Sequence, residues 1–162
     1  MAFDRFALLE RAESYLMAPP ALARIVRPEA HGNRVARFVL PLELCKPQNR
    51  KRMDQPWAAK KYLDAVAQAM AVQVRPWRSP LQGRPHVHCV RFSSVEPDPY
   101  SDWAKVAVDV LCAPCKRNTN RLNIIADDAP RHAEVVQWWE PAPRGDGFVY
   151  IEVWTGRKAA AA

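Results

Sequence analysis

The residues best suited to chemistry form a short acidic segment around one lysine in the middle of the chain. In EPDPYSDWAKVAVDVLC, residues 96–112, three aspartates flank Lys105: Asp98, Asp102 and Asp109. On a helix, at about 100° per residue, Asp102, Lys105 and Asp109 fall within about 60° of one another and form a narrow polar ridge. The ridge suits an ordinary surface ion pair with Ser101 or Asp102 as the helix cap, or a site for a charged substrate.

A second acidic pair, Asp127 and Asp128, follows the apolar run at residues 122–126. Adjacent carboxylates repel each other and need a cation nearby. Carboxylates from two segments of a basic protein suit a hard divalent ion such as Mg²⁺, with Mn²⁺ as a substitute, because hard cations prefer oxygen ligands. With a phosphodiester supplying further oxygens, the ion would activate water, and Lys105 would donate to the phosphorane or the leaving oxygen. The two acidic segments therefore predict metal-dependent hydrolysis of a phosphodiester.

The order of these residues resembles the RusA family of Holliday-junction resolvases. That family shows Asp-x-Asp-Asn, then two residues, Lys, three more residues and Asp-Ala-Leu, followed later by Asp-Asp. Lys105, Asp109 and Leu111 match this pattern in register, and so does the later acidic pair. The basic segment KPQNRKR, residues 46–52, is similar to the Pro- and Asn-containing segment of the family, with Asn49 as the matching Asn. The resemblance covers residues 34–156 in element order.

The chain departs from the family pattern upstream of Lys105. Without a gap, Asp102 falls on the family's Asn, while Ser101 and Pro99 fall on its two metal-binding Asp positions. We favour an insertion of Tyr100 and Ser101, because a loop aspartate and an aspartate at the helix start can still converge. The resemblance then implies three catalytic residues, Asp102, Lys105 and Asp128, and four metal ligands, Asp98, Asp102, Asp127 and Asp128.

The resemblance also implies a homodimer that binds four-way DNA junctions and cuts paired strands symmetrically with Mg²⁺. The charge agrees with a polyanionic partner, since the chain has 24 Lys and Arg residues and 17 Asp and Glu residues, which gives a net charge of +7. Residues 46–61 alone hold six cations and one acid. We expect the DNA contacts at Asn49, Arg50, Lys51, Arg52, Lys116 and Arg117.

The chain length, 162 residues with 49% hydrophobic content, predicts a single compact domain. We expect an α+β fold in which a small mixed β-sheet packs against helices, as in RusA. The predicted domains are an N-terminal helical extension at 1–30 and a RusA-like nuclease domain at 31–157. Periodicity predicts helices at 57–74 and 101–112, and strands from 34, from 86, at 132–141 and at 147–156. APRGDG suits a hairpin between the last two strands, and Pro41 predicts an edge strand or a bulge.

Two other patterns leave alternatives open. The CAPC segment places Cys112 and Cys115 at zinc-ligand spacing, with His86, His88 and Cys89 upstream. They predict either buried structural thiols or, as the rival function, a non-catalytic, zinc-bearing DNA-binding module. Of the adjacent tryptophans at 138 and 139, we expect one buried and one exposed. The exposed one suits stacking on unpaired bases at a junction, and the alternative is packing in the core or in a dimer. The apolar stretches are shorter than a membrane span, so we expect no membrane partner and a cytoplasmic protein.

Overall fold

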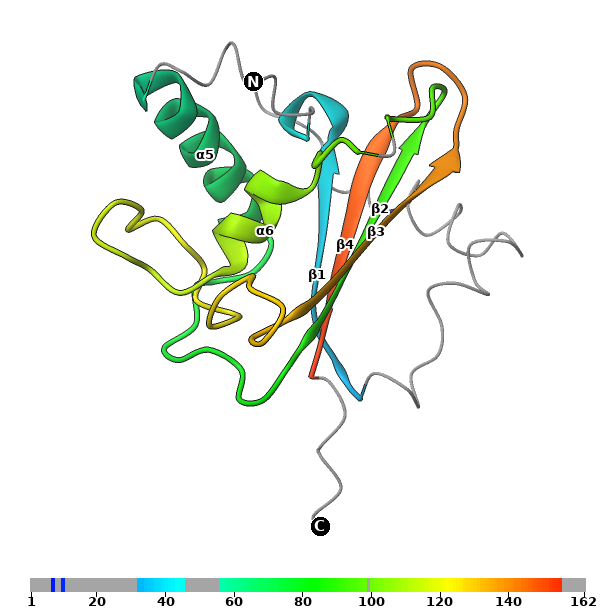
Figure 1. Ribbon diagram of the computed structural model, residues 1–162. Coiled ribbons are helices and arrows are strands. Elements are labelled where there is room, and N and C mark those ends of the chain that lie inside the picture. Colours follow the sequence, from blue (N-terminus) through cyan, green and yellow to red (C-terminus); the bar gives the residue numbers. More distant parts are fainter. Residues whose placement is uncertain (1–6, 8–9, 11–31, 46–55, 99, 156–162) are drawn as a thin grey trace.

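The computed structural model describes residues 7, 10, 32–45, 56–98 and 100–155. Its elements follow the predicted order of strand, helix, strand, helix, strand and strand (Figure 1). They are β1 (Arg34–Pro41), the 3-10 turn η1 (Leu42–Leu44), α5 (Pro56–Ala71), β2 (His86–Ser93), α6 (Lys105–Leu111), β3 (Glu134–Pro141) and β4 (Phe148–Trp154). The predicted N-terminal extension lies outside the described residues except for Ala7 and Glu10, which are both helical.

The four strands form one mixed sheet in the order β1-β4-β2-β3. β4 pairs antiparallel with both β1 and β2, whereas β3 runs parallel to β2 at the edge. β1 is the other edge strand and has an irregularity between Arg34 and Ala36, and Pro41 is its last residue. The structure confirms the predicted α+β domain with a small mixed sheet. No helix in the described part of the chain is long and apolar enough to cross a membrane.

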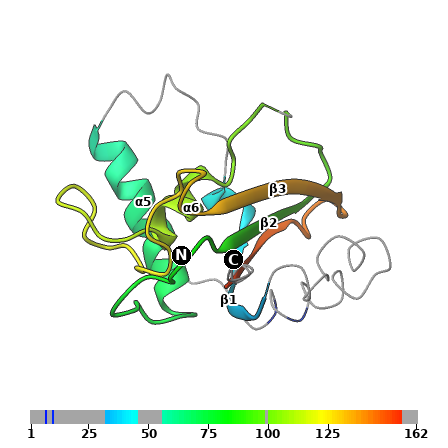
Figure 2. The same cartoon turned by 60° about the horizontal axis from the view of Figure 1, so that its bottom comes forward.

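The predicted hairpin between the last two strands is wrong, because β2 lies between β3 and β4. Burial explains this order. All seven residues of β4 are buried, whereas β3 is largely exposed or half-buried. The sequence FVYIEVW is apolar on both faces and gains most in the centre of the sheet, while the polar residues of EVVQWWEP tolerate an edge. Figure 2 shows β3 on the outer side of β2.

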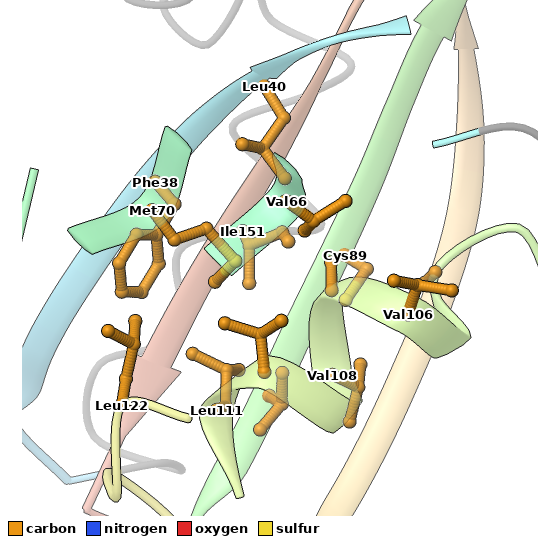
Figure 3. Packing of buried hydrophobic residues seen from close by; sticks show 14 of the residues in the cluster. Phe38, Leu40, Val66, Met70, Cys89, Val106, Val108, Leu111, Leu122 and Ile151 are labelled. Carbon is orange, nitrogen blue, oxygen red and sulfur yellow. The ribbon is translucent and has the colours of Figure 1, made fainter. Parts of the chain in front are cut away.

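Helices α5 and α6 pack on the same face of the sheet, where they form the main core (Figures 1 and 3). In α5, the side chains at Leu63, Val66, Ala67 and Met70 are buried at the helical spacing that the sequence predicted. They meet the inward side chains of the strands, among them Phe38 and Ile151 in Figure 3. This packing fixes α6, with its polar ridge, against the sheet.

Helix α6 begins at Lys105, four residues later than predicted. Its N-cap is Ala104, so neither Ser101 nor Asp102 stands at the cap position itself, although the backbone N–H of Lys105 still interacts with the Asp102 carboxylate. An Asp98 side-chain oxygen accepts the N–H of Tyr100 at 2.9 Å, and its carbonyl accepts that of Ser101 at 2.8 Å. This turn occupies the backbone groups just upstream of the helix.

The opposite face of the sheet carries a smaller cluster of buried side chains. Phe92 and Phe148 stack there with their ring centroids 4.5 Å apart, and Trp138 packs against the cluster. Trp139 points to the helix side, where its Nε1 donates to the carbonyl of Ser93 at 3.0 Å. Both tryptophans are half-buried, so the expectation of one buried and one exposed indole is wrong. Each indole has a packing contact of its own at the edge strand.

Candidate active site

Lys105 holds two carboxylates together at the start of α6. Its Nζ donates to Oδ1 of Asp109 at 2.7 Å and to Oδ2 of Asp128. Asp109 lies one helical turn after Lys105, on the ridge that the sequence predicted. Asp128 lies 23 residues after Lys105 and reaches it only through the tertiary structure. We call Asp102, Lys105, Asp109, Asp127 and Asp128 the acidic cluster.

The segment after α6 carries Asp128 back to the helix. The N–H of Leu122 donates to the carbonyl of Val110 at 2.7 Å, and that of Ile124 to Leu111 at 2.8 Å. The side chains of Leu122, Ile124 and Ile125 are fully buried, which anchors this extended segment in the core. The chain leaves the core after Ile125, so Asp127 and Asp128 stand at the surface beside the ridge. The apolar run that the sequence analysis noted is therefore what positions the second acidic pair.

The contacts in the acidic cluster shift the pKa values of Lys105 and Asp128. Burial raises the pKa of Asp128, but the hydrogen bonds and charge of Lys105 outweigh burial and hold it below the ordinary value. Burial likewise disfavours the charged form of Lys105, yet Asp109 and Asp128 raise its pKa above the ordinary lysine value. Lys105 is therefore protonated throughout the physiological range.

Asp102 belongs to the same electrostatic environment without pairing with Lys105. Burial raises the pKa of Asp102, the charges of Asp109 and Asp128 raise it further, and Lys105 opposes the shift. The predicted surface pair of Asp102 with Lys105 is replaced by the Lys105 contacts to Asp109 and Asp128. An added cation would favour ionised Asp102, because it would offset the neighbouring negative charges.

Asp127 and Asp98, the other two predicted metal ligands, differ in their positions. Oδ1 of the exposed Asp127 accepts the N–H of Asp128 at 2.8 Å, which places it at the rim of the acidic cluster. Asp98 is tied into its own turn. It lines a separate hollow of about 330 Å³ with Trp103, Gln137 and neighbouring residues, and it makes none of the contacts described for Lys105. Of the four predicted ligands, Asp128 therefore contacts Lys105, Asp127 is bound to the backbone of Asp128, Asp102 affects Asp128 through its charge, and Asp98 binds its own turn.

Cys112 is a neighbour of the acidic cluster that the sequence analysis did not assign to it. Ligand atoms of Asp109, Cys112 and Asp128 all lie within 4.8 Å of one another. The spacing of Asp109 and Cys112, three residues apart across the end of α6, is the signal that would have found this proximity. The thiol is buried, donates to the carbonyl of Val108 at 3.4 Å, and has a pKa that burial raises to about 12. A protonated thiol is a poor ligand, so carboxylate oxygens dominate the donor set, and this set fits a hard cation such as Mg²⁺.

The residues of the alternative zinc site lie apart. Cys112 and Cys89 are buried in the main core, as the structural interpretation of these thiols predicted, while Cys115 is exposed. His88 packs against Trp138 and Trp154 on the opposite face of the sheet, and Nδ1 of His86 lies 3.6 Å from a carboxylate oxygen of Glu134. Within the described ranges, the one group of three or more potential metal ligands is Asp109, Cys112 and Asp128.

The predicted DNA-binding residues fall into two groups. Asn49, Arg50, Lys51 and Arg52 lie outside the described residues. Lys116 and Arg117 are exposed at the tip of a turn that reciprocal backbone hydrogen bonds of 3.0 Å close between Cys115 and Asn118. Their position agrees with a role in binding phosphates.

No family model and no curated protein matches the chain. A function for the acidic cluster therefore has to be argued from its residues and their arrangement.

Proposed function

We propose that the protein is a Mg²⁺-dependent endodeoxyribonuclease that resolves four-way DNA junctions by paired nicking. The observation that carries the proposal is the convergence of carboxylates from two chain segments on Lys105. A surface ion pair needs one carboxylate. A set of four, Asp102, Asp109, Asp127 and Asp128, leaves an excess of negative charge around one lysine, which a divalent cation can neutralise.

Asp102 and Asp128 are the residues that would hold the ion, with Asp127 at the rim. When bound there, Mg²⁺ supplies an activated water and neutralises charge on the phosphate. Asp98 was predicted as a further ligand, and its separate position leaves the other three carboxylates as the proposed set.

Lys105 provides the positive charge that a phosphodiester needs in the transition state. Its Nζ bridges Asp109 and Asp128, so it stays protonated and points along the polar ridge. From there it would donate a hydrogen bond to a nonbridging or leaving oxygen of the phosphate, where negative charge develops. Asp109 positions the ammonium group through the i, i+4 contact. The arrangement supports hydrolysis by positioning and charge stabilisation, the means by which phosphoryl-transfer enzymes act.

The choice of branched DNA rests on the likeness to RusA in residue order together with the positive charge. A net charge of +7 favours a polyanion, while the acidic cluster alone would repel one. Lys116 and Arg117 provide exposed cations in the loop that follows α6. Two copies of the chain in a symmetric dimer would present two acidic clusters to a junction with two strands to cut.

A cleavage assay tests this proposal. Labelled four-way junction and matched duplex are incubated with and without Mg²⁺, using wild type, Asp128→Asn and Lys105→Met, with Glu43→Gln as a control that neutralises an exposed carboxylate in η1. We expect Mg²⁺-dependent nicking of the junction by wild type and Glu43→Gln, with a loss of at least about 100-fold in the two site variants. Wild-type rates for folded Asp128→Asn and Lys105→Met would refute the proposal.

Two measurements separate the zinc-bearing alternative and test the dimer. Elemental analysis of protein purified without chelator should find no stoichiometric zinc. Stoichiometric zinc together with junction binding but no cleavage would favour the non-catalytic DNA-binding module instead. Light scattering should give the mass of two chains, and a monomer that remains monomeric on the junction would contradict paired nicking.

A further inference from the structure

A second hollow, of about 480 Å³, lies beyond the end of α6, apart from the acidic cluster. Three segments line it: α5 with Asp64 and Gln68, the loop after α5 with Pro76 and Trp77, and the loop after α6 with Asn120 and Arg121. Its volume is within the range of about 300–1,000 Å³ that is typical of small-molecule sites. We call it the Trp77 pocket.

Hydrogen bonds between the lining segments build the Trp77 pocket in advance of any ligand. The N–H of Trp77 donates to the carbonyl of Leu122 at 2.8 Å, and Nδ2 of Asn123 donates to the carbonyl of Trp77 at 3.1 Å. Across the opening, Nδ2 of Asn120 donates to Oδ1 of Asp64 at 3.1 Å and joins the loop after α6 to α5. Because the walls are tied together, a ligand would meet a preorganised surface.

The chemistry of the Trp77 pocket combines an aromatic face with amides and cations. Trp77 is half-buried, and the exposed Arg75 and Arg78 flank it in the chain. Lys116 and Arg117 lie within two residues of the lining residues Pro114 and Thr119. Among the described residues, no ion pair involves any of these four cations. An indole in the lining, with exposed cations on the two loops that form the walls, suits a ligand that carries both a planar ring and phosphates.

Arg121 adds a second, independent sign of a polar ligand. Its Nη1 donates to the carbonyl of Ala113 at 3.1 Å, while its Nε is buried and has no hydrogen-bond partner among the described residues. A guanidinium N–H without a partner costs free energy, so a small turn of this side chain toward an acceptor on a ligand would be favourable. Asp64 is the one carboxylate that lines the pocket, and Asn120 already binds it.

One wall of the Trp77 pocket, at Pro114, follows the acidic cluster closely in the chain. Cys112 is in contact range of Asp109 and Asp128, and the lining residue Pro114 is two positions further along the chain. Two residues span at most about 7.6 Å between Cα atoms, at 3.80 Å per step. A strand whose phosphate lies at the acidic cluster would therefore pass near the Pro114 wall of the Trp77 pocket.

We propose that the Trp77 pocket binds an unpaired nucleotide next to the scissile phosphate. This inference rests on the proposed nuclease function and specifies its substrate. The base stacks on Trp77, its edges meet the amides of Gln68 and Asn120, and the flanking phosphates meet the surrounding cations. A paired base cannot enter, because it must first leave the stack of the duplex. The pocket thereby selects DNA in which a base is already unpaired, as at a branch point.

Fluorescence polarisation without Mg²⁺ tests this inference separately from cleavage. The probes are a labelled short single strand, a blunt duplex of the same sequence and the mononucleotide dAMP as competitor. The variants are Trp77→Ala and Trp77→Phe, with Arg121→Met as a variant of the pocket arginine. Arg144→Ala is the control for Arg121→Met, because it also removes one positive charge. Arg144 is exposed in the connection between β3 and β4, at the end of the sheet away from the pocket loops (Figure 1).

Loss of the indole should weaken binding of the single strand by roughly 5- to 150-fold, the range expected for one stacked base, and leave duplex binding unchanged. Trp77→Phe should keep most of the affinity, and Arg144→Ala should keep the preference for the single strand. Competition by dAMP alone would show that a free nucleotide suffices, whereas competition only by the strand would show that flanking phosphates are also needed. Both outcomes support the pocket.

The result that overturns the inference is equal single-strand affinity in wild type and in folded Trp77→Ala. If Trp77→Ala fails to fold, Arg121→Met serves as the second test. It should also weaken binding of the single strand, and an affinity equal to that of wild type would again overturn the inference. Failure of cleavage by wild type, with selective single-strand binding intact, would overturn the nuclease function and leave the nucleotide site standing.

Discussion

The ion pairs of Lys105 can be measured, because each has a different expected strength. The Lys105 to Asp128 contact is a charge-assisted hydrogen bond, a class worth about 1.5–3 kcal/mol when well shielded. The Lys105 side chain is 36% exposed and that of Asp128 27%, so solvent screens the pair. We therefore expect a coupling free energy of about 1 kcal/mol. The Lys105 to Asp109 pair is an i, i+4 contact on one helix and should contribute about 0.3–0.5 kcal/mol.

Double-mutant cycles separate the two pairs. The free energy of unfolding is measured by denaturant titration for Lys105→Met, Asp128→Asn, Asp109→Asn and the two double variants. Lys105→Met alone should lose about 1–2 kcal/mol and lower Tm by about 2–8 °C. In 1 M salt, where the screening length is about 3 Å, both couplings should shrink.

The pH dependence of the free energy of unfolding provides an independent test of the ion pairs of Lys105. The pKa of Lys105 is raised in the folded state. Its contribution to the free energy of unfolding is therefore complete below the pKa of the unfolded state, about 10.4, and is lost as pH rises through the pKa of the folded state. The pKa of Asp128 is lowered in the folded state. Its contribution to the free energy of unfolding is therefore complete above the pKa of the unfolded state, about 3.9, and is lost as pH falls through the pKa of the folded state. The stabilisation should thus extend between these limits in wild type and be largely absent in Lys105→Met. An Asp128 coupling within error of zero, or smaller than that of Asp109, would refute the described geometry of the acidic cluster.

Further predictions concern other residues of the cluster, the thiols and the basic loop. Asp102→Asn should abolish cleavage and raise the free energy of unfolding at pH 7 only slightly: partial burial and the nearby carboxylates raise the pKa of Asp102 and disfavour its ionised form, but the residue is exposed and solvent screens these charges; a clear loss of stability would contradict this. Cys115 is exposed with a lowered pKa, from hydrogen bonds to the backbone of Arg117 and Asn118, while the other three thiols are buried, so Ellman's reagent at pH 8 should titrate one fast thiol that Cys115→Ser removes. Neutralising Arg50, Lys51 and Arg52 should weaken junction binding and lower the slope of log affinity against log salt by about 0.9 per lost phosphate contact, and an unchanged slope would exclude this role. Gly147→Ala should destabilise the fold by about 1–3 kcal/mol in thermal unfolding, because its Cβ would lie 2.1 Å from Cδ1 of Leu42; wild-type stability would show that Leu42 moves freely.

Local patterns in the sequence predicted most of the elements. The burial of α5 follows from apolar residues at helical spacing, and the pairing of Lys105 with Asp109 follows from one helical turn. These features depend on backbone geometry over a few residues, which side-chain type and spacing determine. The start of α6 was predicted less well, because a turn stabilised by the Asp98 side chain competes with helix over the residues before Lys105.

Contacts between distant segments were decided by packing. That β4 lies between β1 and β2 depends on burying both of its faces, which outweighs the hairpin connection that its sequence also allows. The pairing of Asp128 with Lys105 depends on how Leu122 and Ile124 bond to the end of α6, and the Trp77 pocket depends on three segments meeting. Residue types and spacing already showed that carboxylates, a lysine and cations are present at suitable intervals along the chain. Which of these side chains meet depends on the fold, because the contacts arise from burial of apolar side chains far apart in the chain.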